Sequence, residues 1–214
     1  MEELLKPTAY IDSNHPDVCR FALEAAGTSD SKKEQAVRLY YAVRDGFTYN
    51  PYCLTLMREH YRASYVLGRE EGFCIQKAIL LAAVARALGI PSRLGFATVR
   101  NHLATKKMHK LMKTDLFVFH GYTTLFIDGK WVKATPAFDI KLCDRFGVLP
   151  LEFDGSTDSI FHPFDSSGKR HMEYVHDYGV FDDFPFELMI DEFKKYYPHV
   201  VEHFSRGIKM PAVF

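Results

Sequence analysis

The sequence predicts an α+β protein in which N-terminal helices pack on an antiparallel β-sheet. Two amphipathic helical patterns and one long apolar helical pattern come before residue 90. Extended stretches rich in β-branched and aromatic residues follow, and Asp128-Gly129 joins two of them as a tight hairpin turn. A run of helices followed by a run of antiparallel strands is typical of the α+β class.

Length and composition indicate an ordinary globular chain and exclude several classes of partner. The chain has 214 residues, of which 47% are hydrophobic and 25% charged, so we expect a single domain over residues 1–214. The formal net charge is zero, which favours neither nucleic acid nor a membrane surface as a partner and leaves the oligomeric state open. A basic cluster in residues 100–113 is interpreted as a solvated face.

The cysteine pattern and the N-terminus favour the cytoplasm. The four cysteines are far apart and form no Cys-x-x-Cys pair, which is typical of a reducing compartment. No signal peptide pattern opens the sequence, and its longest apolar run is interrupted by Gln76, Lys77 and Arg86. We therefore expect no membrane-spanning segment.

Capping residues place the helices before residue 50 and near the end of the chain. Residues 14–26 form the first expected helix, with Asn14 as its cap and Gly27 after its end. Residues 31–45 form the second, where Ser31 and Glu34 have the spacing of a capping box. A last helix is expected over residues 185–197, with Asp183 as its cap.

The strands of the expected sheet lie in the second half of the chain. They cover residues 92–99, 116–127 and 130–134, with further extended segments at 148–153 and 172–175. The aromatic residues that follow Phe138 are interpreted mainly as core.

Cys74 is the leading candidate for a nucleophile. It opens an apolar helix that runs to about Leu88 and stops at Gly89, with Pro91 beyond it. Unpaired main-chain N–H groups and the positive dipole end of a helix favour a thiolate at this position. Cys53 and Cys143 do not begin a helix and are interpreted as structural.

A cysteine nucleophile needs a base, and His120 is the best candidate among the ten histidines. It lies within a long apolar strand, where a rigid element can hold a catalytic group precisely in place. The hairpin at Asp128-Gly129 brings residues 130–138 beside that strand, so Thr135 and Asp139 are the candidates to orient the imidazole. Asp139 is the first choice because it carries a charge.

The sequence resembles the transglutaminase-like superfamily over residues 47–139. The resemblance rests on a glycine and a cysteine that open a helix, the end of that helix, a histidine on a strand, a following tryptophan strand and an upstream aromatic residue: Gly72-Phe73-Cys74, Arg86-Ala87-Leu88-Gly89-Ile90-Pro91, His120-Gly121-Tyr122, Trp131 and Tyr49. The family implies a papain-like α+β core and a Cys-His-Asp triad. It also implies acyl transfer at amide bonds through a thioester acyl-enzyme, as in a protease, amidase, deamidase or transglutaminase. The substrate would be a peptide or protein amide, or a small amide, and no cofactor is implied.

The sequence departs from the family pattern at two places. Thr135-Pro136 stands where the family has an aspartate before the proline, so either Asp139 or Thr135 would orient His120. His120-Gly121-Tyr122 replaces a common His-Ala-Trp. For the oxyanion of the tetrahedral intermediate, the candidate donors are the main-chain N–H of Cys74 and, less directly, the side chains of Tyr49, Tyr52 and Gln76.

Other types of site and other functions have less support in the sequence. His162, His171 and His176 do not have the spacing of a zinc site, and no calcium loop or nucleotide-binding motif is present. A transglutaminase-like binding domain without catalytic activity is the main alternative, because the expected aspartate is missing. A redox-sensing thiol is a third reading, and it lacks a resolving cysteine near Cys74.

Overall fold

The computed structural model describes residues 1–102, 110, 112–161, 165, 167–169 and 171–205. Most of the basic cluster and His162 lie outside these residues. The helices are η1 (Glu2–Leu5), α1 (Pro16–Ala26), α2 (Lys32–Gly46), η2 (Pro51–Cys53), η3 (Arg58–Tyr61), α3 (Ala63–Arg69), α4 (Cys74–Ala87), α6 (Ile140–Phe146), α7 (Phe186–Tyr196) and α8 (Pro198–Ser205). The strands are β1 (Thr48–Tyr49), β2 (Glu71–Gly72), β3 (Ser92–Asn101), β4 (Leu116–Ile127), β5 (Lys130–Ala134) and β6 (Met172–Phe181).

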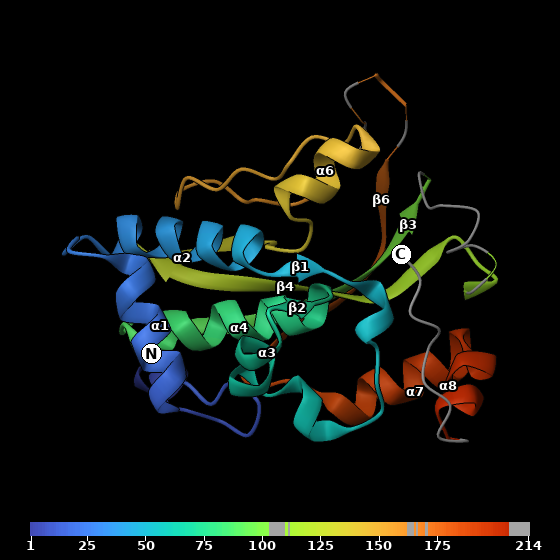
Figure 1. Cartoon of the computed structure of the whole chain (residues 1–214), viewed down its shortest axis with the longest axis horizontal. Coiled ribbons are helices and arrows are strands. Elements are labelled where there is room, and N and C mark those ends of the chain that lie inside the picture. Colours follow the sequence, from blue (N-terminus) through green and yellow to red (C-terminus); the bar gives the residue numbers. More distant parts are fainter. Residues whose placement is uncertain (103–109, 111, 162–164, 166, 170, 206–214) are drawn as a thin grey trace.

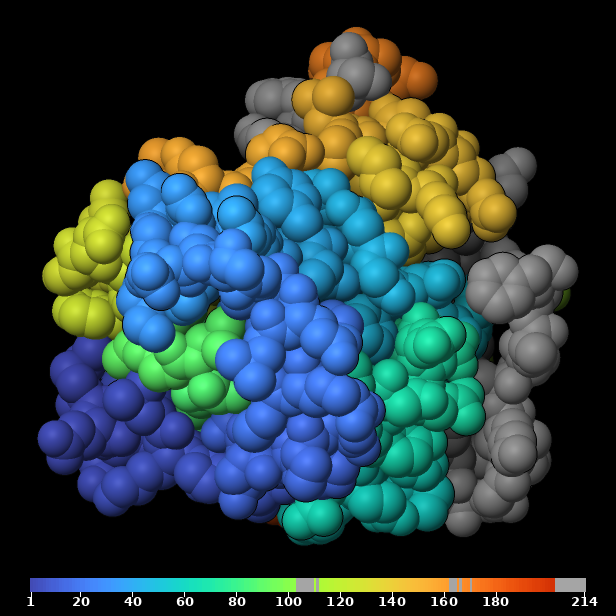
Figure 2. All heavy atoms as spheres, turned by 60° about the vertical axis from the view of Figure 1, so that its left-hand side comes forward, coloured from blue at the N-terminus to red at the C-terminus, as the bar shows by residue number. Residues whose placement is uncertain are grey.

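A four-stranded antiparallel sheet and the helices on one of its faces make up the main architecture. The strand order is β5-β4-β3-β6, and β1 and β2 form a separate short parallel pair. Helix α4 packs beneath β4 and β3, with α1, α2 and α3 around it (Figure 1). Figure 2 shows α1 and α2, in blue, forming one continuous face of the molecule. The predicted α+β class is confirmed.

Helix α4 is the centre of the core, because every residue from Cys74 to Arg86 is buried. Its three polar side chains do not interrupt burial, since each has main-chain partners. Lys77 donates from Nζ to the carbonyls of Arg44 and Phe47 at 2.8 and 2.7 Å, which closes the end of α2. Arg86 donates to the carbonyls of Lys6, Ser92 and Asp182 at 2.7–2.8 Å. These bonds tie distant segments to the central helix.

The hairpin between β4 and β5 has the predicted turn. Asp128 and Gly129 both have positive φ, 49° and 82°, as a type I′ turn requires. The pairing Ile127↔Lys130 to Thr123↔Ala134 follows directly from this turn. Strand β5 ends there, so residues 116–122 of β4 extend beyond it.

Several local predictions are wrong. His15 rather than Asn14 caps α1, and its Nδ1 accepts from the N–H of Asp17 at 3.3 Å. Asp183 does not cap α7, because its Oδ2 accepts from the N–H of Ala9 at 3.1 Å and Pro185 takes the cap position. Residues 148–153 form no strand; the carbonyl of Leu151 accepts instead from the side chains of Tyr40 and Arg44. None of the described helices has the length and apolar run that crossing a bilayer requires.

Candidate active site

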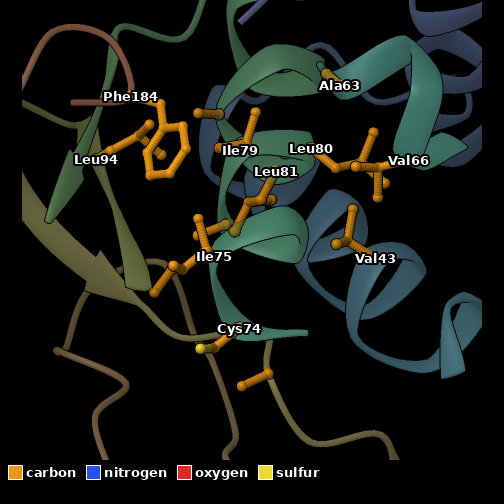
Figure 3. Close-up of a cluster of buried hydrophobic side chains, with 14 of the residues drawn as sticks. Val43, Ala63, Val66, Cys74, Ile75, Ile79, Leu80, Leu81, Leu94 and Phe184 are labelled. Carbon is orange, nitrogen blue, oxygen red and sulfur yellow. The ribbon is translucent and has the colours of Figure 1, made fainter. Parts of the chain in front are cut away.

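Cys74 is the first residue of α4, and Phe73 is the N-cap. The N–H of Phe73 donates to Oε1 of Gln76 at 3.3 Å, while Nε2 of Gln76 donates to the carbonyl of His60 at 2.9 Å. Both ends of the Gln76 amide therefore fix the start of the helix. Figure 3 shows the Cys74 sulfur at this end of α4, beyond the packed side chains of Ile75 and Ile79.

Burial favours the neutral form of the Cys74 thiol. Only 8% of the residue is exposed. Burial raises the pKa of the thiol to about 11, although hydrogen bonds from main-chain N–H groups, including those of Gly121 and Ile75, act to lower it. The sequence predicted a thiolate from the helix start alone. The donors of the helix start are present, but desolvation outweighs them.

His120 is also buried and neutral. It is 5% exposed, and burial lowers its pKa to about 3. Its ring packs against Phe161, with 4.7 Å between the ring centroids. Within the described part of the chain, Nε2 of His120 is buried without a hydrogen-bond partner.

Gly121 allows β4 to approach the start of α4 closely. A Cβ atom at Gly121 would lie 2.9 Å from Cα of Ile75 and 3.4 Å from the carbonyl oxygen of Cys74. The neighbouring Phe119 has a φ of 62°, at a bulge where the register with β3 shifts. Gly121 is one of the two departures from the family pattern. The close approach of α4 explains why a residue without a side chain is suited to this position. The sequence predicted a regular strand here and gave no indication of the bulge.

The two candidates for the third group lie in different environments. Asp139 caps α6: its Oδ1 accepts from the N–H of Leu142 at 3.0 Å, and its Oδ2 accepts from the N–H of Tyr49 at 2.8 Å. Both carboxylate oxygens are thus bound to the main chain. Thr135 is 1% exposed, and its Oγ1 has no hydrogen-bond partner among the described residues. If the pairing Thr123↔Ala134 is continued by one residue, Thr135 stands opposite Tyr122. Tyr122 and His120 are two residues apart on β4, so Thr135 and His120 lie on the same face of the sheet.

Tyr49 lies close enough to Cys74 to interact with it electrostatically. Burial, followed by the charge of a Cys74 thiolate, raises the pKa of the Tyr49 phenol well above its ordinary value. Its ring contacts Phe138 at 4.8 Å between centroids, and Phe138 contacts Phe161 at 5.0 Å. A row of rings thereby connects Tyr49 to His120.

Cys74 and His120 line one cavity of about 60 Å³, which we call the Cys74 cavity. Its wall comes from the start of α4, the segment after β1, one half of β4, and the α7 region. The lining residues are Tyr49, Pro51, Leu54, Phe73, Cys74, Ile75, Met112, Phe117, Val118, Phe119, His120, Phe193 and Tyr197. The structure therefore brings together three residues that the sequence singled out, Cys74, His120 and Tyr49.

Tyr197 lines this cavity at the end of β4 that β5 does not cover. Its hydroxyl donates to the carbonyl of Leu116 at 2.6 Å and accepts from the N–H of Val118 at 2.7 Å. The residue is 1% exposed and lies between α7 and α8. A side chain thus makes the hydrogen bonds that a neighbouring strand would make. The sequence reasoning missed Tyr197, because nothing along the chain relates it to residues 116–118.

No group of three His, Cys, Asp or Glu side chains within the described ranges is placed to hold a metal ion. Cys53 and Cys143 do not line the Cys74 cavity. Burial raises their pKa values to about 12 and about 11. Of these three cysteines, Cys74 lines the cavity that His120 also lines.

Two solved structures resemble the chain at low sequence identity. A "putative cysteine protease" from Cytophaga hutchinsonii is 16% identical with a TM-score of 0.49; the match covers 83% of this chain and 53% of that protein. A "putative protease" from Parabacteroides distasonis is 19% identical with a TM-score of 0.41, over 63% of this chain and 24% of that protein. The chain thus spans only part of either protein, and no curated protein matches it.

The profile of one family matches more than half of the chain. It covers residues 20–136 and describes the transglutaminase-like superfamily. The matched segment holds both Cys74 and His120, on a helix start and an adjoining strand as the sequence resemblance predicted. The chain therefore belongs to the transglutaminase-like superfamily.

Proposed function

We propose that the protein is a cysteine-dependent enzyme of acyl transfer at amide bonds. The observation that carries this proposal is that Cys74 and His120 line the same cavity. Family membership supports the reaction class. The substrate is then a peptide or protein amide, or a small amide, and the acyl acceptor is water or an amine.

In the proposed reaction, Cys74 attacks the carbonyl carbon while His120 takes the thiol proton. The S–C bond forms, the C–N bond to the leaving amine breaks, and His120 returns the proton to that amine. Water or a second amine then attacks the thioester and releases Cys74. A thiol with a pKa of about 11 and an imidazole with a pKa of about 3 that share a cavity do not form a resting ion pair. We therefore expect proton transfer to accompany the attack.

The developing oxyanion needs fixed donors beside the sulfur. The main-chain N–H of Cys74 lies at the start of α4, where no intrahelical carbonyl is available to it. The Tyr49 hydroxyl is the side-chain candidate, because Tyr49 interacts electrostatically with the thiolate and lines the cavity. Gln76 is a weaker candidate, since its amide is engaged with the main chain at both ends.

For the third group we favour Thr135 over Asp139. Both oxygens of Asp139 accept main-chain N–H groups, whereas Thr135 lies on the same sheet face as His120 and its buried Oγ1 is not engaged by any described residue, Nε2 of His120 included. In Thr135→Val, a similar shape without the hydroxyl, we expect about a tenfold loss of acylation rate with no loss of stability. An unchanged rate would remove Thr135 from the mechanism. Asp139→Asn is the comparison, and it should lower stability because its single amide oxygen cannot accept from the N–H groups of both Tyr49 and Leu142.

The direct test is to trap the acyl-enzyme. The full chain is incubated with a mixed pool of peptides and with 4-nitrophenyl esters, and a thioester is sought on Cys74 by mass spectrometry. We expect the adduct in the native chain and its absence in Cys74→Ala. His120→Ala should slow its formation by at least about a hundredfold. A chain that alkylates at Cys74 yet forms no thioester with any acyl donor would instead be the inactive binding domain.

A further inference from the structure

Among the described residues that line the Cys74 cavity, none has a charged side chain. Of its thirteen lining residues, the only polar side chains are those of Cys74, His120, Tyr49 and Tyr197. The Tyr197 hydroxyl is already occupied by Leu116 and Val118. An ionised group placed in this cavity would therefore find no partner of opposite charge among the described lining residues.

An unpaired charge in such surroundings is strongly disfavoured, because it loses its hydration without compensation. The titratable groups of the cavity itself show the effect: burial keeps both His120 and Cys74 neutral. A neutral apolar group, in contrast, is stabilised when it enters the cavity. It contacts Leu54, Phe73 and Phe193 and loses no hydrogen bond to water.

The size of the cavity favours small groups over large ones. At about 60 Å³ it exceeds the space of one water molecule, which needs roughly 10–15 Å³. It is smaller than the engineered cavity of about 150 Å³ that binds benzene. A short aliphatic group matches this space better than an aromatic ring does.

We propose that the Cys74 cavity is the acyl pocket of the enzyme and takes a short, uncharged aliphatic group bonded to the carbonyl carbon that Cys74 attacks. This inference rests on the proposed function and adds the class of acyl group. Met112 and Phe193 are the specificity-determining residues, because each supplies a wall of the pocket and neither belongs to the reacting pair. Acyl groups with a carboxylate, an ammonium or a large ring are excluded.

The test uses the full chain and matched 4-nitrophenyl esters of butyrate, succinate and phenylacetate. In each reaction the Cys74 S–C bond forms, the C–O bond to the phenol breaks, and 4-nitrophenol leaves with the thiol proton. Rates are divided by those for N-acetylcysteine, which removes intrinsic differences in ester reactivity. We expect butyrate to acylate Cys74 at least about a hundredfold faster than succinate on this scale, with phenylacetate slower than butyrate.

Two variants change the wall without touching the reacting pair. Met112→Lys introduces a cation into the half-buried wall position and should reduce the preference for butyrate over succinate by at least about tenfold. Met57→Lys is the control: Met57 is 50% exposed and outside the cavity, so the preference should stay unchanged. Phe193→Ala enlarges the pocket and should raise the rate with phenylacetate relative to butyrate.

The possible outcomes distinguish a failure of the pocket assignment from a failure of the proposed function. If none of the esters forms a thioester on Cys74, the proposed function falls and the inference falls with it. If Cys74 is acylated but the butyrate-to-succinate ratio equals that of N-acetylcysteine, the reaction class stands and the pocket assignment is wrong. An equal shift in Met112→Lys and Met57→Lys would likewise overturn the assignment.

Discussion

Removing one hydroxyl group, in Tyr197→Phe, should weaken the fold and open the Cys74 cavity. The hydroxyl accepts from the N–H of Val118 and donates to the carbonyl of Leu116, at 2.7 and 2.6 Å. Both main-chain groups lie at the end of β4 that β5 does not cover. Phenylalanine keeps the ring in place but leaves these two groups without a partner.

The size of the effect follows from these two bonds. A buried group left unpaired costs about 1–3 kcal/mol, and entry of water into the cavity will offset part of the sum. We take about 2 kcal/mol as the net loss in the free energy of unfolding. For a chain of this size that corresponds to a drop in Tm of about 4–8 °C. If the same free energy is lost from the local opening equilibrium around the cavity, the open form becomes about 30-fold more populated. Cys74 should then react with iodoacetamide about 30-fold faster.

The assay pairs urea unfolding with the rate of Cys74 alkylation, read by mass spectrometry of the Cys74 peptide. Tyr196→Phe is the matched control, because it makes the same change at the adjacent, half-buried position. We expect Tyr196→Phe to resemble the native chain in both measurements. If the two variants unfold at the same urea concentration and label at the same rate, the Tyr197 hydroxyl does not hold the cavity closed.

Three further perturbations test the site and its surroundings. Gly121→Ala should destabilise the fold by about 1–3 kcal/mol, because its Cβ would lie 2.9 Å from Cα of Ile75; Gly68→Ala, whose Cβ meets nothing within 4 Å, is the control, and equal urea midpoints would contradict the prediction. The alkylation rate of Cys74 should rise about tenfold per pH unit toward its pKa of about 11, whereas a plateau near neutral pH would mean a thiolate at rest. Burial lowers the pKa of Lys77 from 10.5 to about 7, so the folded state binds fewer protons than the unfolded state between these two pH values. The free energy of unfolding should therefore rise with pH from about 7 to 10.5. If Lys77→Met shows the same slope, Lys77 is not its source.

Elements defined by local chemistry were predicted well. The Asp128-Gly129 turn set the register of β4 and β5, and both strands have the predicted bounds. Ser31 caps α2 by accepting from the N–H of Glu34, as the capping-box spacing predicted. Such signals act over a few residues, so the sequence contains all of the information that they need.

Elements that depend on distant partners were predicted less well. Asp183 has the composition of a cap, but its carboxylate binds the N–H of Ala9 from the other end of the chain. Helix α6 was not predicted, and its cap is Asp139, which the sequence assigned to the catalytic triad. A carboxylate near a proline fits both roles, and only the positions of Tyr49 and Leu142 distinguish them.

The sequence alone determined the α+β class, the family, and the positions of a cysteine at a helix start and a histidine on a strand, which the structure places at one cavity. Periodicity, turn residues and a continuous motif are local properties, and they suffice for these conclusions. The tertiary structure decided the state of that pair. Burial comes from Tyr197, Phe193 and Phe161, which are remote along the chain, and it outweighs the helix-start donors that favour a thiolate. Desolvation depends on all surrounding atoms, so a pKa at this site follows from the folded cavity and not from the motif.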